Sequence, residues 1–280
     1  MRKLICMIVA LILIVPAIHT NAAGNTTANA TNAYFKVGNG YYSTLKAALA
    51  DAPSSADKTI YLLKNAEISE SALAVPAGTN ITLDLGGHTL TNKFDTQYLM
   101  TSVRGTLTIK NGNLNVIKGI VVQGGGHLII DNVKYTVNNT SSNARPAVKL
   151  NGAGETKLTV RDSYLKTLGP GESLVLVEQG TDGTINLEGN TTLEYGGVLD
   201  NAVQNCAAIA VQPSSTTNTN LRLNMGAKAK IVNTAPAIDK PDYVASAIVL
   251  QTNGNITLNL EKGATVAIDR DGGESKSYHI

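Results

Sequence analysis

A short unit of alternating apolar and polar residues recurs along the chain and restricts its possible folds more than any other feature. Each unit has two or three apolar residues in alternate positions, which is typical of a β-strand with one buried face. The units begin at residues 81, 107, 128, 158, 185, 221 and 256, so their spacing is uneven. Propeller blades need a uniform period of about 40–45 residues, and leucine-rich repeats need a shorter period with fixed Leu and Asn positions. The uneven spacing favours stacked coils with insertions at their corners.

Two further short strands accompany most of these units. One precedes the unit, and another often follows it after a corner that contains Gly or Asn. The insertions are rich in Asn, Ser, Thr, Gly or Pro and predict loops at residues 138–145, 196–205, 212–220 and 234–242. Coils of two or three strands with variable corner loops predict an all-β fold, specifically a single-stranded right-handed parallel β-helix, which is a solenoid.

The residue after the second apolar position of each unit is polar in every case. Strands stacked in register would bring neighbours of this series to within about 4.8 Å of each other. Opposite charges on adjacent strands stabilise a sheet modestly, whereas like charges destabilise it. The signs alternate over the first five positions and therefore predict in-register stacking. Along the chain the series reads Asp84, Lys110, Asp131, Arg161, Glu188, Asn224 and Asn259.

Both ends of such a stack expose unpaired strand edges and need a cover. Near the N-terminus, residues 44–50 predict a short amphipathic capping helix, because Ser43 or Thr44 can cap its first turn. A first strand is expected at residues 59–63. After residue 268 the chain is polar and contains Gly, and the sequence offers no evident cover for the last coil.

The first residues have the order of positive charge, apolar run and small residues that marks a secretory signal peptide. The apolar run is interrupted by Pro16 and is too short for a membrane anchor, and cleavage is expected after Ala22 or Ala23. The predicted location is therefore extracellular or at the cell surface. The expected organisation is a signal peptide at 1–23, a lead-in at 24–40, a β-helix domain at 41–268 that includes the capping helix, and a polar tail at 269–280.

Composition excludes several classes of function. The formal net charge of +2 gives no basic stripe for nucleic acid, and no later stretch of the chain is apolar enough to span a membrane. Removal of the signal peptide leaves Cys206 as the single cysteine, and its apolar surroundings predict a buried, inert thiol rather than a reactive one. Aromatic residues make up only 4% of the chain, which argues against an enzyme cleft lined by aromatic sugar platforms.

Residues 41–49, 60–64 and 75–90 resemble a known group of sequences. They read Tyr-Tyr-Ser-Thr-Leu-Lys-Ala-Ala-Leu, then Ile-Tyr-Leu-Leu-Lys, then Val-Pro-Ala-Gly-Thr-Asn-Ile-Thr-Leu-Asp-Leu-Gly-Gly-His-Thr-Leu. This order is similar to the pectin lyase-like right-handed parallel β-helix segments of bacterial secreted and cell-surface proteins, although Gly86 stands where Asn is usual. The resemblance is close over residues 40–92 and elsewhere is one of repeat style. It implies fold and export, but a fold alone does not supply an activity.

Four charged residues are the nearest approach to a catalytic site. Polysaccharide lyases of the resembled fold use clustered acids that bind Ca²⁺, an ion that takes 6–8 oxygen ligands, and a basic residue that abstracts a proton. Glycoside hydrolysis needs two carboxyl groups about 5–9.5 Å apart. The alternative for these residues is a structural charge ladder. His88 and His127 lack an evident third ligand, so neither a metal nor another cofactor is expected. The four candidate residues are Asp131, Arg161, Asp162 and Glu188.

The sequence favours a secreted or surface-associated, non-catalytic β-helix module that binds a surface glycan or a host or cell-surface protein, as an adhesin does. The tyrosines expected to be best placed for carbohydrate are Tyr135, Tyr164 and Tyr195. One alternative is a polysaccharide lyase or glycoside hydrolase acting in a groove on the β-helix face. Another is a structural repeat domain whose uncapped C-terminal coil binds a protein partner or a second copy of the chain.

Overall fold

The fold is known from a computed structural model that describes residues 28–138, 145–170, 173–198, 206–212, 216–236, 246–269 and 276–279. The predicted signal peptide at residues 1–23 lies outside these described residues, as do parts of the predicted corner insertions and of the C-terminal tail. Across the described ranges the chain is almost entirely β-structure, with one short α-helix, and most strands run parallel. The expected all-β fold with parallel strands is therefore confirmed.

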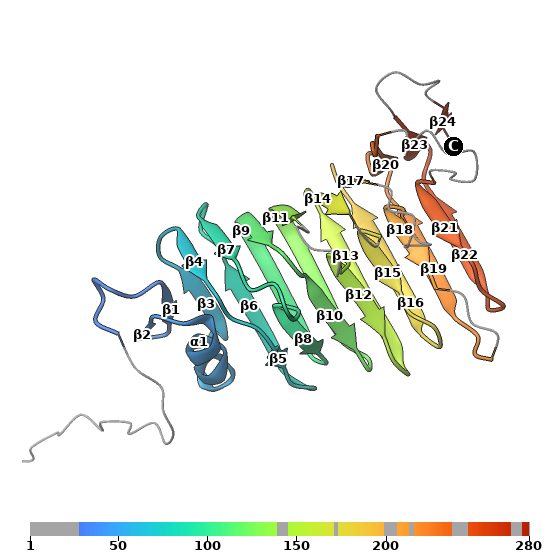
Figure 1. The fold of residues 1–280 in the computed structure, drawn as a ribbon. Helices are drawn as coiled ribbons and strands as arrows, with labels where there is room; N and C mark the ends of the chain where they lie inside the picture. Colours follow the sequence, from blue (N-terminus) through green and yellow to red (C-terminus); the bar gives the residue numbers. More distant parts are fainter. Residues whose placement is uncertain are drawn as a thin grey trace, which may run out of the picture.

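The parallel strands stack into three ladders (Figure 1). The first ladder contains the recurring units, paired in register from end to end. In chain order it consists of β3 (Thr59–Leu62), β6 (Asn80–Asp84), residues 106–110 of β9 (Thr106–Val116), residues 127–131 of β11 (His127–Asn138), β13 (Glu155–Arg161), β16 (Asp182–Glu188), β19 (Asn220–Met225) and β22 (Ile256–Leu260).

The other two ladders contain the accompanying strands. The second follows the first at a corner and consists of β4 (Ala66–Ile68), β7 (Thr89–Asn92), the second halves of β9 and β11, β14 (Tyr164–Pro170), β17 (Thr192–Val198), β20 (Lys230–Asn233) and β23 (Thr265–Ile268). The third consists of β5 (Leu73–Val75), β8 (Met100–Val103), β10 (Ile120–Gln123), β12 (Val148–Asn151), β15 (Val175–Val177), β18 (Ile209–Val211) and β21 (Ile248–Leu250). The chain visits the ladders in the repeated order third, first, second, which is consistent with a β-helix.

The core lies on the inward faces of the ladders. Alternate apolar residues of the first ladder stack directly on one another, because their strands pair without a shift. Burying an aliphatic side chain of this size stabilises a fold by about 1.5–3 kcal/mol. One such row is at most 2% exposed along its length and comprises Ile81, Leu107, Leu128, Leu158, Ile185 and Leu223.

The corner between the first and second ladders requires left-handed backbone. Five stacked positions have φ between +46° and +61°, a region that only Gly, Asn and Asp adopt readily. The side chains at this corner also bond along the stack: Asn132 Nδ2 donates to Asn111 Oδ1 at 3.3 Å, and Asn111 Nδ2 donates to Asp84 Oδ1 at 3.2 Å. The five positions are Gly86, Asn111, Asn132, Asp162 and Gly189.

The N-terminal end of the stack is covered. Helix α1 (Leu45–Asp51) lies where a capping helix was expected and is followed by the 3₁₀ turn η1 (Ala52–Ser54). Thr44 Oγ1 accepts a hydrogen bond from Ala47 N at 3.2 Å, and the Glu70 carboxylate accepts two more from the first turn of the helix. A hairpin that the sequence did not predict, β1 (Phe35–Val37) and β2 (Gly40–Tyr42), adds to the edge of β3 in the antiparallel direction.

The C-terminal end is only partly covered. Strand β24 (Lys276–His279) pairs antiparallel with β23 and covers the edge of the second ladder. No strand of the described part of the chain pairs with the outer edges of β21 and β22. Leu250 on β21 and Leu258 on β22 are 38% and 44% exposed. No helix in the described ranges is long and apolar enough to cross a membrane.

Candidate functional site

The side chains on the outward face of the first ladder form three rows, because in-register strands place equivalent residues about 4.8 Å apart. We name them the charged row, the amide row and the mixed row. The charged row is Asp84, Lys110, Asp131, Arg161 and Glu188. The amide row is Thr82, Thr108, Ile129, Thr159, Asn186, Asn224 and Asn259, and the mixed row is Asn80, Thr106, His127, Lys157, Thr184, Arg222 and Thr257.

The charged row forms ion pairs along the stack. Lys110 Nζ lies 3.4 Å from Asp84 Oδ2. The Arg161 guanidinium binds carboxylates on both sides, with Nη1 at 3.5 Å from Asp131 Oδ2 and Nη2 at 2.8 Å from Glu188 Oε2. The hydrogen bond that Arg161 donates to Glu188 raises the pKa of Arg161, and the nearby charges of Glu188 and Asp131 raise it further. The in-register stacking predicted for these five residues is confirmed.

The prediction was wrong for the last two members of that series. Asn224 lies opposite Asn186 rather than beyond Glu188, and Asn259 lies opposite Asn224. A pattern with period two determines which face a residue takes, but it does not distinguish pairings that differ by a shift of two residues. The two asparagines therefore belong to the amide row.

The four predicted catalytic candidates come together around Arg161, but each carries a structural contact. Asp131 and Glu188 are the two carboxylates paired with the guanidinium. Asp162 occupies the left-handed corner, where its Oδ1 accepts a hydrogen bond from Asn190 N at 2.8 Å. The Arg161 guanidinium pairs with two of these acids, and the third accepts a backbone hydrogen bond from the next coil. All three carboxylates therefore make contacts along the stack.

The predicted binding tyrosines occupy two kinds of environment. Tyr135 and Tyr195 are fully buried, and the Tyr135 hydroxyl donates to Ala147 O at 2.9 Å. Their rings therefore present no face to a ligand. Tyr164 faces outward on the second ladder, and its hydroxyl donates to Glu194 Oε2 at 2.5 Å.

Glu194 is the centre of a polar cluster that the sequence did not identify. Its Oε1 lies 2.7 Å from Lys166 Nζ and accepts a hydrogen bond from Thr234 Oγ1 at 2.8 Å. Burial acts to raise the pKa of Glu194, but hydrogen bonds from Lys166, Tyr164 and Thr234 outweigh burial and lower it. Lys166 and Glu194 are direct partners on adjacent strands, so correct register would have revealed the pair.

No metal centre is evident in the described ranges, which contain no group of three His, Cys, Asp or Glu side chains able to hold an ion. His127 instead contacts Thr159, with Nε2 at 2.9 Å from Oγ1. Burial lowers the pKa of His127, and the positive charge of Lys157 lowers it further. The neutral imidazole is therefore favoured near pH 7.

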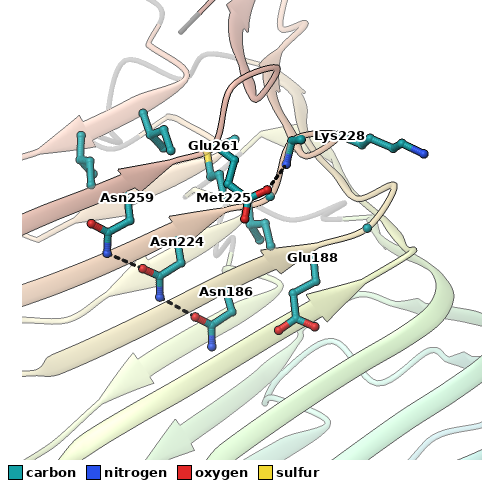
Figure 2. A pocket seen from close by; sticks show the side chains of 13 residues that line it. Asn186, Glu188, Asn224, Met225, Lys228, Asn259 and Glu261 are labelled. Carbon is teal, nitrogen blue, oxygen red and sulfur yellow. Dashed lines mark hydrogen bonds between the residues drawn. The ribbon is translucent and has the colours of Figure 1, made fainter.

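The amide row contains a directional chain of hydrogen bonds (Figure 2). Asn259 Nδ2 donates to Asn224 Oδ1 at 2.7 Å, Asn224 Nδ2 donates to Asn186 Oδ1 at 2.7 Å, and Asn186 Nδ2 donates to Thr159 Oγ1 at 3.3 Å. The three asparagines line a shallow depression of about 1000 Å³. Glu188, Lys228 and Glu261 line the same depression on the side of the corner between the first and second ladders. Since an amide has two donor hydrogens and an oxygen with two lone pairs, each asparagine keeps hydrogen-bonding capacity for a ligand.

The charged row continues onto the N-terminal strands, where aromatic residues replace the acids. Asp84 lies opposite Tyr61 on β3, Tyr61 lies opposite Lys36 on β1, and Lys36 lies opposite Tyr41 on β2. Tyr61 is 41% exposed. The sequence did not identify Tyr41 because the hairpin that carries it was not predicted. Tyr61 lies on the predicted first strand and alternates with buried residues there, which was a signal that its side chain faces outward.

Comparison of the chain with protein-family models, with curated proteins and with solved structures gave no match.

Proposed function

We propose that this chain is a secreted or surface-associated, right-handed parallel β-helix of the pectin lyase-like type that binds a glycan without turning it over. The cyclic order of the three ladders supports the solenoid. The resemblance over residues 40–92 supports the family, and the charged, apolar and small residues at the start of the chain support export.

The observation that carries glycan binding is the directional amide chain. Each asparagine side chain is held in one orientation by its neighbours, so little conformational entropy is lost when a ligand binds. The remaining amide donors and acceptors repeat at about the strand spacing of 4.8 Å. A polysaccharide offers hydroxyl groups at regular intervals and is therefore a complementary ligand.

The pairing of the acids supports a binding role over a catalytic one. General acid–base catalysis needs a carboxyl group that is available to the reacting atoms. Asp131 and Glu188 instead bind Arg161, and Glu194 accepts hydrogen bonds from three side chains.

The first test is binding without turnover. We expect the full chain to bind one or more polysaccharides on a glycan array and to release no reducing or unsaturated sugar from them. The double substitution Asn186→Ala with Asn224→Ala should weaken binding about tenfold, since each hydrogen bond contributes roughly 0.5–1.5 kcal/mol and 1.4 kcal/mol is a factor of ten. Lys93→Ala, which removes an exposed side chain beside the second ladder, is the control.

Sugar release would contradict this proposal and favour a lyase or hydrolase. The decisive variants are Asp162→Asn and Glu188→Gln, because both keep the size of the side chain, and Asn also tolerates the left-handed corner. Activity in the unmodified chain that disappears in either variant would establish catalysis.

A second function is favoured by the last coil, where no strand in the described ranges pairs with the outer edge of β22. An exposed strand edge can accept an extended segment of another protein as an added strand. The edge of β22 fits a partner segment with apolar residues in alternate positions, because Ile256, Leu258 and Leu260 take the inward face there. Asn259 adds an acceptor, since its Nδ2 donates to Asn224 while its Oδ1 points away from Asn224 (Figure 2).

A further inference from the structure

Three outward side chains form a line across the N-terminal strands. Tyr41, Lys36 and Tyr61 are direct partners on β2, β1 and β3. The side chains that alternate with them are buried: Phe35, Val37, Tyr42, Ile60 and Leu62. Because adjacent strands are about 4.8 Å apart, the two tyrosines stand roughly 10 Å from each other with Lys36 between them. We name these three residues the tyrosine–lysine patch.

The patch is held in place by polar contacts while its rings stay accessible. Lys36 Nζ lies 5.9 Å from the centre of the Tyr41 ring, within the range of a cation–π contact. The Tyr61 hydroxyl donates to Asp57 Oδ2 at 3.3 Å, which leaves the ring faces free of hydrogen bonds. Tyr61, Leu250 and Leu258 are the exposed large apolar side chains of the described ranges, and Tyr61 alone among them lies at the covered end.

The charges around Tyr61 discriminate between ligand classes. Asp57 lies beside it and Asp84 lies opposite it on the next strand. Hydrogen bonds from the Thr59 backbone and from Ser55 lower the pKa of Asp57, so this carboxylate is ionised at neutral pH. Asp84 is already paired with Lys110, so the carboxylate that disfavours a polyanion, such as nucleic acid or an acidic polysaccharide, beside the Tyr61 hydroxyl is that of Asp57.

A neutral pyranose sugar suits this combination of groups. One face of a pyranose ring carries C–H groups that can pack against an aromatic ring, while its equatorial hydroxyl groups point sideways. Those hydroxyls would donate to the Asp57 carboxylate and accept from Lys36. The line from Tyr41 to Tyr61 points down the stack toward Asp84, so successive sugar rings of one chain can lie along it.

We propose that the tyrosine–lysine patch is a binding site for a neutral polysaccharide, with the face of a sugar ring packed on Tyr61. This inference rests on the proposed glycan binding and adds a site and a ligand class to it. The competing explanation is that the patch only stabilises the hairpin through its cation–π contact.

The test measures binding of the full chain to neutral and anionic oligosaccharides by calorimetry, with a cello-oligosaccharide and an oligogalacturonate as the probes. Tyr61→Ala should weaken binding of the neutral probe about tenfold, whereas Tyr61→Phe, which keeps the ring, should change it by less than about twofold. Circular dichroism and thermal unfolding check that both variants fold. If Tyr61→Ala does not fold, Tyr61→Thr replaces it, because Thr is well accommodated in strands.

Each outcome bears on a different claim. Binding that persists unchanged in Tyr61→Ala, but is lost on substitution of Asn186 and Asn224, overturns the patch and leaves the proposed function intact. Stronger binding of the anionic probe than of the neutral one overturns the ligand class. Hairpin destabilisation in Tyr61→Ala with no change in affinity shows a purely structural patch. Absence of binding to both probes and to every glycan on the array defeats the proposed function itself.

Discussion

Arg161 on β13 stands between two carboxylates, Asp131 on β11 and Glu188 on β16, and pairs with both. Arg161→Gln should lower the free energy of unfolding by about 0.5–1 kcal/mol, a modest amount because the ion pairs are exposed to solvent. Urea denaturation measures the change, with Arg222→Gln, on the mixed row, as the control. At about 1 M salt, where the Debye length is roughly 3 Å, the difference between Arg161→Gln and the unmodified chain should shrink. A difference that does not depend on salt would contradict an electrostatic role.

The carboxylate of Glu194 predicts how the stability of the fold depends on pH. Its folded pKa lies below the ordinary Glu value of 4.5, so it stabilises the fold above that value, and this contribution is lost as pH falls through the folded pKa. Glu194→Gln should therefore destabilise the protein at pH 7 and have progressively less effect below pH 4.5. Thermal unfolding at both ends of this range measures it, beside Glu67→Gln, which alters an exposed ion pair. Equal destabilisation by Glu194→Gln at both pH values would count against the assigned role.

For single residues, the sequence predicted the arrangement of charged side chains better than the accessibility of aromatic rings. The in-register stacking of the charged row was predictable, because its signs alternate in the sequence and opposite charges on adjacent strands attract each other. The burial of Tyr135 and Tyr195 was not, since an aromatic residue in an alternating strand can take either face until the corner before it is placed. Asp162 likewise reads as a free carboxylate until its left-handed corner is known.

Helix α1 depends on a residue that is distant in sequence. Glu70, in the loop between β4 and β5, accepts hydrogen bonds from Leu45 N at 2.9 Å and Lys46 N at 2.7 Å. Loss of such helix-capping bonds typically costs about 0.5–2 kcal/mol. Glu70→Ala should lower the free energy of unfolding by about that amount, measured by urea denaturation, whereas Glu67→Ala on β4 should have a smaller effect. Equal effects of the two substitutions would show that the cap contributes little.

Helices and strands were predictable where the local sequence pattern determines them. They were missed where contacts with distant parts of the chain determine them. Apolar periodicity and Thr44 were sufficient to predict α1, and alternation was sufficient for the strands of the first ladder. The hairpin of β1 and β2 consists of two three-residue strands, too short for a periodic signal, and it forms because β3 offers an open edge. The shift of Asn224 and Asn259 into the amide row had the same origin: only the contacts of whole coils select among pairings that keep the same face.

On the scale of the whole molecule, the two ends of the stack differ, and this difference predicts association at one of them. Hairpin and helix cover the N-terminal end, whereas no strand among the described residues pairs with the outer edge of β22, and Leu258 is 44% exposed (Figure 1). A synthetic peptide with the sequence of residues 256–260 should add to this edge, because its alternate apolar residues would continue the core rows. Fluorescence anisotropy of the labelled peptide measures its binding.

Two substitutions on β22 test whether the peptide binds through the inward-facing apolar residues of this strand. Leu258→Lys places a charge on the inward face and should abolish peptide binding, because an unpaired charge would have to be buried. Thr257→Lys adds the same charge on the outward face and should leave binding within about twofold. Sedimentation velocity over a range of protein concentrations separates a foreign strand from a second copy of the chain: association of the protein with itself, sensitive to Leu258→Lys alone, would identify the occupant as another copy. Equal effects of both substitutions would mean that net charge, rather than the exposed core residues of β22, governs association. If neither measurement detects binding, the edge of β22 is not an interaction surface.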